Sequence, residues 1–109
     1  MNTNDLHEAA AALHGMELVK VVHYPSHDVL LKLLEERVNL LINHDLQRLI
    51  QILYRMDVPE KELRRTLDRT NGSNAALTIA TMMLNRELQI IETRKRYRSM
   101  DDIPEEDKW

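Results

Sequence analysis

Only two glycines and three prolines occur among the 109 residues, and the segments between them repeat apolar residues at helical spacing. Glycine and proline supply the tight turns and phosphate-binding loops on which many active sites depend. Here Gly15 is expected to end a first helix, and Gly72 is expected to separate two later helices. The sequence therefore predicts an all-α fold, a small antiparallel bundle of four to five helices, and gives little support to a loop-based catalytic site.

The composition is that of one folded domain. Apolar residues make up 43% of the chain, and cysteine is absent, so neither a disulfide nor a thiolate metal site can form. The first residues lack the basic start and continuous apolar run of a secretion signal. No segment approaches the roughly 18 uncharged residues that a membrane span requires. We expect a cytoplasmic protein that does not enter a membrane.

The best-defined helix is expected over His27–Asn43. Ser26 is a suitable N-cap for it, and leucines and a valine repeat along one face. The polar stretch Asn43–Asp45 interrupts this pattern and predicts a helix end, with Asp45 as the N-cap of a new helix; one unbroken helix is the alternative. The apolar stripe of the next helix consists of Leu46, Leu49, Ile50, Leu53 and Met56. Ile52 lies off that stripe.

The second half of the chain predicts one turn and two further helices. Asp57–Glu60 combines a proline with capping-box spacing and predicts a turn. A short, strongly charged helix follows, with Leu63 and Leu67 as its apolar anchors. The last helix is expected over Asn74–Arg98 and is the longest.

The domain organisation is expected to be simple. Residues 1–99 form one helical domain, in which residues 1–26 are interpreted as a less ordered extension. Within that extension Met16–Tyr24 is ambiguous between helix, strand and irregular structure, because its valines suit a strand that has no partner in the chain. Residues 100–109 form an acidic tail in which Pro104 discourages a helix.

Three segments carry a resemblance to known proteins. They are Arg48–Val58, Arg86–Arg94 and the closing Asp102–Trp109. Over about residues 27–109 the chain resembles a group of small uncharacterised bacterial all-helical proteins with no established activity. The resemblance implies a bacterial origin and supports the helix boundaries, and it carries no catalytic residues.

The residues that usually perform catalysis or bind metals are not arranged for it. His23 and His27 are four residues apart, but a proline between them argues against a shared helical turn, and no Glu-x-x-His motif occurs. Glu35–Glu36 and the pair Glu60 and Glu62 lie in charge-rich stretches typical of solvated helix faces. We expect no catalytic residue, no metal and no cofactor.

Basic residues gather in two places and suggest a contact with a polyanion. The candidates are Arg64 and Arg65 in the short charged helix, and Arg94, Lys95, Arg96, Tyr97 and Arg98 at the end of the last helix. An aromatic ring among cations suits phosphate contact with base stacking. The helix dipole also favours cations at a helix C-terminus, and a net charge of −3 is unusual for a nucleic-acid module. A nucleic-acid-associated protein is therefore the alternative.

Surplus apolar residues point instead to self-association. A small monomer cannot easily bury two faces of several helices. The candidate contact face consists of Leu33, Leu40, Ile52, Tyr54 and Met82, which lie off the main stripes of their helices. The sequence therefore predicts a non-catalytic protein–protein interaction or scaffold protein that forms a homodimer.

Overall fold

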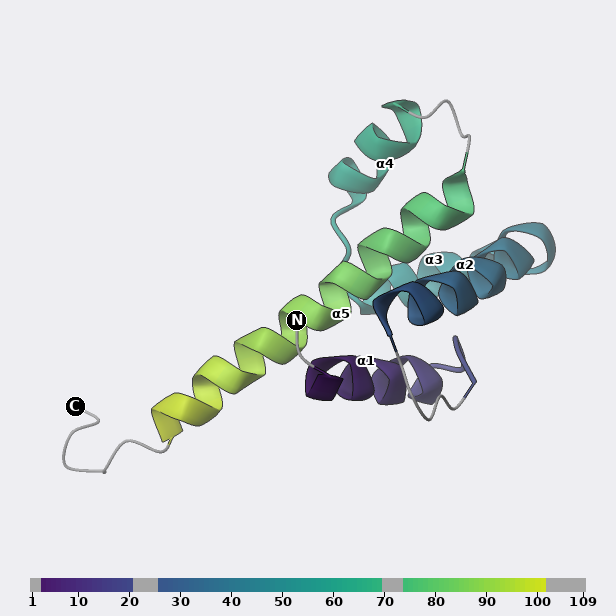
Figure 1. The fold of residues 1–109 in the computed structure, drawn as a ribbon. Coiled ribbons are helices and arrows are strands. Elements are labelled where there is room, and N and C mark those ends of the chain that lie inside the picture. Colours follow the sequence, from purple (N-terminus) through teal and green to yellow (C-terminus); the bar gives the residue numbers. More distant parts are fainter. Residues whose placement is uncertain (1–2, 21–25, 70–73, 102–109) are drawn as a thin grey trace.

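The computed structural model describes residues 3–20, 26–69 and 74–101, which are organised as five helices (Figure 1). The helices are α1 (Thr3–Gly15), α2 (His27–His44), α3 (Leu46–Arg55), α4 (Glu60–Arg69) and α5 (Ala75–Asp101). The expected all-α fold with a long last helix is confirmed. No strand occurs in the described ranges.

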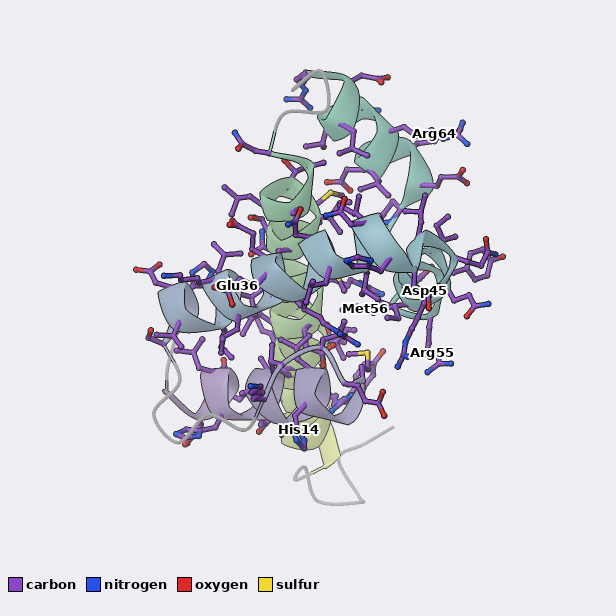
Figure 2. The ribbon with its side chains drawn as sticks, turned by 90° about the vertical axis from the view of Figure 1, so that its right-hand side faces the viewer. His14, Glu36, Asp45, Arg55, Met56 and Arg64 are labelled. Atoms are coloured by element: carbon purple, nitrogen blue, oxygen red, sulfur yellow. The ribbon has the colours of Figure 1, made fainter. Side chains whose placement is uncertain are left out.

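Helix α5 is the element on which the others assemble. Helices α1 and α2 both pack against it, α4 packs against its first turns, and α3 packs mainly against α2. Both α1 and α2 cross α5 instead of running alongside it (Figures 1 and 2). The last turns of α5 extend past α1, which contributes to an elongated molecule of 54 × 33 × 22 Å.

The core is aliphatic, since the chain has no phenylalanine. Its largest fully buried side chains come from four helices: Leu13, Leu30, Leu34, Val38, Leu49, Met83, Leu84 and Ile91. Burying a side chain of this size stabilises a fold by roughly 1.5–3 kcal/mol relative to leaving it exposed. The crossing helices therefore hold together chiefly through leucine and methionine contacts around α5.

Two side-chain caps set the boundaries of α2 and α3. The backbone N–H of Val29 donates to Oγ of Ser26 at 3.2 Å, and that of Arg48 donates to Oδ1 of Asp45 at 3.2 Å. Both predicted N-caps are confirmed, and the unbroken-helix alternative is wrong. Asp45 also donates its own backbone N–H to the carbonyl of Leu41 at 2.8 Å, so one residue ends α2 and begins α3.

Among the described residues, three other than glycine adopt left-handed backbone conformations close to helix ends. They are Glu17 with φ 60°, Asp57 with φ 59° and Asn74 with φ 56°. At Asp57 the chain leaves α3: the N–H of Val58 then donates to the carbonyl of Leu53 at 3.2 Å. The predicted turn at Asp57–Glu60 is thereby confirmed. Gly72, predicted to serve a similar purpose, lies outside the described residues.

The start of the chain is part of the core, and the interpretation of residues 1–26 as a less ordered extension is wrong for residues 3–20. Ala9 and Leu13 of α1 are fully buried, and Leu18 and Val19 are buried in the irregular segment that follows α1. For Met16–Tyr24 the irregular alternative holds as far as residue 20, and residues 21–25 lie outside the described part. The acidic tail also begins later than expected, because α5 continues to Asp101.

Leu34 and Leu40 offer a matched test of this core, because both are leucines of α2. Leu34 is fully buried, whereas Leu40 is 50% exposed. We expect Leu34→Ala to lower the free energy of unfolding by about 2–5 kcal/mol, because it leaves a cavity against α5. Leu40→Ala should lower it by less than about 1 kcal/mol. Urea unfolding followed by circular dichroism measures both, and equal losses would contradict the described packing of α2.

Candidate self-association surface

Helix α3 is apolar on two sides. One side, formed by Leu49, Ile52, Leu53 and Met56, is buried against the rest of the molecule. The other side carries Leu46, Ile50 and Tyr54, which are 52%, 49% and 88% exposed. These three residues follow each other at four-residue intervals and therefore form a continuous row along the helix, which we call the α3 outer row.

The fold leaves this row uncovered because α4 turns away from α3. After Met56 the left-handed conformation at Asp57 redirects the chain, and α4 packs against the first turns of α5. Figure 1 shows α4 beside the start of α5 and well separated from α1. The outer side of α3 is consequently exposed to solvent.

Polar contacts hold α3 in place at both of its ends. Near its start, the guanidinium group of Arg48 donates to Oε2 of Glu17 at 2.6 Å, which ties α3 to the segment after α1. At its end, Nε of Arg86 on α5 donates to the carbonyl of Met56 at 3.0 Å. Another guanidinium nitrogen of Arg86 lies 3.6 Å from a carboxylate oxygen of Asp57. The outer row is thus presented by a helix that is anchored to two other parts of the molecule.

Opposite charges lie at the two ends of α3, roughly 140° around the helix from Ile50. Asp45 precedes the outer row in sequence and Arg55 follows it, and both residues are exposed. Figure 2 shows the two side chains on the same outer side of the molecule. None of the ion pairs among the described residues includes either of them. Asp45 instead accepts the capping hydrogen bond from the backbone N–H of Arg48.

The five residues predicted as a contact face do not lie together. Ile52 is only 8% exposed and belongs to the core, so its assignment to the face was wrong. Leu33 is half-buried against the core, and Met82 lines a hollow of about 390 Å³ beside Arg86. Leu40 is exposed on α2 and Tyr54 is exposed on α3. Of the five, only Tyr54 belongs to the outer row.

Leu46 and Ile50 are the members of the row that sequence reasoning missed. Both were assigned to the buried stripe of this helix, but they face solvent. The buried side of α3 is rotated by roughly 50° from the predicted stripe, taking 100° per residue. The rotation brings Ile52 into the core and moves Leu46 and Ile50 out of it.

The two groups of basic residues lie at opposite ends of α5. Figure 2 shows Arg64 on α4 at one end, while the end of α5 that carries Arg94 to Tyr97 lies at the other. The two groups therefore do not lie side by side. The side chain of Arg98 lies outside the described part of the structure.

Several of these cations already have carboxylate partners. Arg64 bonds Glu60 at 2.7 Å, and Arg96 bonds Glu92 at 3.1 Å. Lys95 forms an ion pair with Asp5 of α1, an interaction that links the two ends of the chain's described part. Arg65, Arg94 and Tyr97 are exposed. The positive charge available to a polyanion is thus smaller than the sequence indicates.

Glu87 is the one charged residue with a buried position among those described, at 4% exposed. It lies on the apolar side of α5, in register with Met83 and Ile91. Burial raises the pKa of its carboxyl group, while the positive charges of Arg94 and then Arg86 act in the opposite direction. Because the shift is upward, desolvation outweighs the attraction of the two arginines.

The described histidines and carboxylates do not form a cluster of three or more that could hold a metal ion. Across the same residues, no helix has both the length and the apolar character needed to traverse a bilayer. No protein-family model matches the chain, and no curated protein or solved structure is significantly similar to it. The resemblance to small bacterial helical proteins therefore stays a prediction.

The buried carboxylate makes stability depend on pH. Between the ordinary pKa of Glu87, 4.5, and its raised value, the folded state binds more protons than the unfolded state. The contribution of this group to the free energy of unfolding is therefore present below pH 4.5 and is lost as the pH rises through the raised pKa. Glu87→Gln removes the titration, so we expect its stability relative to wild type to increase between pH 4 and pH 7.

Urea unfolding of both proteins at several pH values measures this difference. Other titrating groups are common to the two proteins and cancel in the comparison. Parallel pH profiles would show that Glu87 is not desolvated in the folded protein.

Proposed function

We propose that this protein is a non-catalytic helical interaction or scaffold protein that associates with a second copy of itself through the α3 outer row. The observation that supports this proposal is the exposure of Leu46, Ile50 and Tyr54 side by side on one short helix. Large apolar side chains scattered singly over a surface are normal. A row of three on one helix is the pattern by which an amphipathic helix binds an apolar partner surface.

The way α3 is held supports the same function. Binding is weakened by every group that must be ordered on association. Two hydrogen bonds hold α3 at its ends. Arg48 donates to Glu17 near the start of the helix, and Arg86 donates to the carbonyl of Met56 just after its end. A helix that is already positioned loses little conformational freedom when its outer row becomes covered.

The size of the row limits the expected affinity. A contact between two ten-residue helices buries on the order of 1,000 Å² or less, the lower end of the range for specific interfaces. Large side chains contribute up to about 1.5–3 kcal/mol each on full burial, but association itself costs several kcal/mol. We therefore expect a dissociation constant in the micromolar range, which corresponds to about −8 kcal/mol.

Ile50→Asp tests the proposal at the centre of the row. A carboxylate there would have to be desolvated in the contact, so we expect the dissociation constant to rise by at least about tenfold. Leu40→Asp is the matched control, because Leu40 is 50% and Ile50 is 49% exposed, but Leu40 lies on α2 outside the row. We expect the control to leave association unchanged.

Sedimentation velocity over a range of micromolar concentrations measures all three proteins. A wild-type protein that stays monomeric throughout would remove self-association from the proposal. A wild-type dimer that Leu40→Asp weakens and Ile50→Asp does not would move the contact to α2.

A further inference from the structure

Helix α4 contributes little to the core and carries its charges outward. None of its ten residues is buried, and the two leucines that pack against the core, Leu63 and Leu67, are half-buried. Arg65 lies two residues from each leucine, which places it roughly 160° around the helix from both. The side of α4 that faces solvent is therefore the side that carries Arg65.

Three cations form a row along this outer side. Lys61, Arg65 and Arg69 follow each other at four-residue intervals, and all three are exposed. They span about 12 Å of the helix at 1.5 Å per residue. None of the ion pairs among the described residues includes any of them. We call these residues the α4 cationic row.

Further charged residues of α4 lie beside the row. Arg64 and Asp68 line a shallow surface hollow together with the three cations of the row. Arg64 is paired with Glu60 at 2.7 Å, and Glu62 lines the separate hollow beside Arg86. Asp68 is the only carboxylate among the described residues that line the shallow hollow, so this side of α4 keeps an excess of positive charge.

The row is electrostatically unfavourable in the free protein. Like charges four residues apart on a helix repel each other, and the row contains two such pairs, Lys61 with Arg65 and Arg65 with Arg69. Lys61 also lies in the first turn of α4, where the helix dipole disfavours a cation. A polyanion whose negative charges lie along the row would relieve both effects.

The chemistry of this side of α4 favours a nucleic-acid duplex over other polyanions. Helices that bind an anionic membrane insert an apolar side, whereas Leu63 and Leu67 are packed against the core. Proteins that bind single strands stack the bases on aromatic rings, and α4 contains none. Contact through charge alone is strongest with a dense array of charges, and a duplex carries one negative charge per about 1.7 Å of its axis.

We infer that the α4 cationic row binds the phosphate backbone of double-stranded nucleic acid without selecting a base sequence. Contacts with phosphates carry no sequence information. The net charge of −3 opposes binding only weakly, because charges farther away than about 10 Å are largely screened at 0.1 M salt. The row lies on a different helix from the α3 outer row, so the inference does not depend on self-association.

Fluorescence anisotropy with a short labelled DNA duplex of mixed sequence tests the inference. We expect a dissociation constant of about 10⁻⁴–10⁻⁶ M, the range of contacts that do not select a sequence. With three phosphates contacted, the affinity should fall about 40-fold when the salt concentration rises from 50 to 200 mM.

Arg65→Glu reverses the charge at the centre of the row, and we expect it to weaken duplex binding by at least about tenfold. Arg55→Glu is the matched control, because it changes the net charge of the chain by the same amount. Arg55 is also exposed and belongs to none of the ion pairs among the described residues, but it lies on α3. We expect the control to weaken binding by less than about threefold, and circular dichroism establishes that both variants are folded.

Four results would overturn the inference. The first is a wild-type protein that does not bind the duplex at about 50 mM salt, where phosphate contacts are strongest. The second is equal weakening by Arg65→Glu and Arg55→Glu, which would show a general attraction to the cations of the chain. The third is weakening by Arg94→Gln and not by Arg65→Glu, which would place the contact at the end of α5. The fourth is tighter binding of the matching single strand, which would indicate base stacking.

Vesicles that contain phosphatidylserine distinguish a lipid surface from a duplex. We expect the wild-type protein to bind the duplex and not to co-sediment with the vesicles. Co-sedimentation that Arg65→Glu abolishes, without binding of the duplex, would assign the row to a membrane surface and overturn the inference.

Discussion

The contact between α5 and the two helices that cross it, α1 and α2, is the interaction on which the rest of the structure depends. Met83, Leu84 and Ile91 lie fully buried or nearly so along α5, and the buried leucines of α1 and α2 pack around them. Helix α4 also uses α5 as its main support. Helix α3 is the exception, because it packs mainly on α2 and reaches α5 through the hydrogen bond from Arg86 to the carbonyl of Met56. A helix at the edge of the assembly has only one side to bury, which is why α3 keeps an apolar row on its surface.

The helix boundaries could be predicted from the sequence because their causes are local. A serine or aspartate that caps a helix acts on backbone groups two or three residues away, so Ser26 and Asp45 could be identified without knowledge of the fold. The length and apolar character of α5 could also be predicted from the sequence. The buried side of α3 could not, because apolar residues occur most of the way round this ten-residue helix. The apolar pattern therefore does not determine which side of α3 is buried. The packing of α3 against α2 decides that Ile52 is buried and Leu46 is exposed.

Contacts between distant parts of the chain were also beyond sequence reasoning. The cation cluster at the end of α5 suggested a site for a polyanion, but Lys95 meets Asp5 at the opposite end of the sequence. Glu17 and Arg48 likewise meet across 31 residues. Charge complementarity can pair any of the chain's fifteen basic residues with any of its acidic residues, and only the crossing of the helices selects among them. For the same reason nothing in the sequence singles out Glu87, which the structure shows to be buried.

The left-handed residues Glu17, Asp57 and Asn74 have a consequence for the unfolded chain. Glycine would adopt these conformations without strain, but each glycine would enlarge the set of conformations open to the disordered state. By using glutamate, aspartate and asparagine at these bends, the protein accepts local backbone strain of about 1 kcal/mol at each. The chain then contains only two glycines. Its unfolded state loses less conformational entropy on folding than that of a chain with glycine at these three positions. The stability of the folded protein thus depends partly on the low conformational entropy of its unfolded chain.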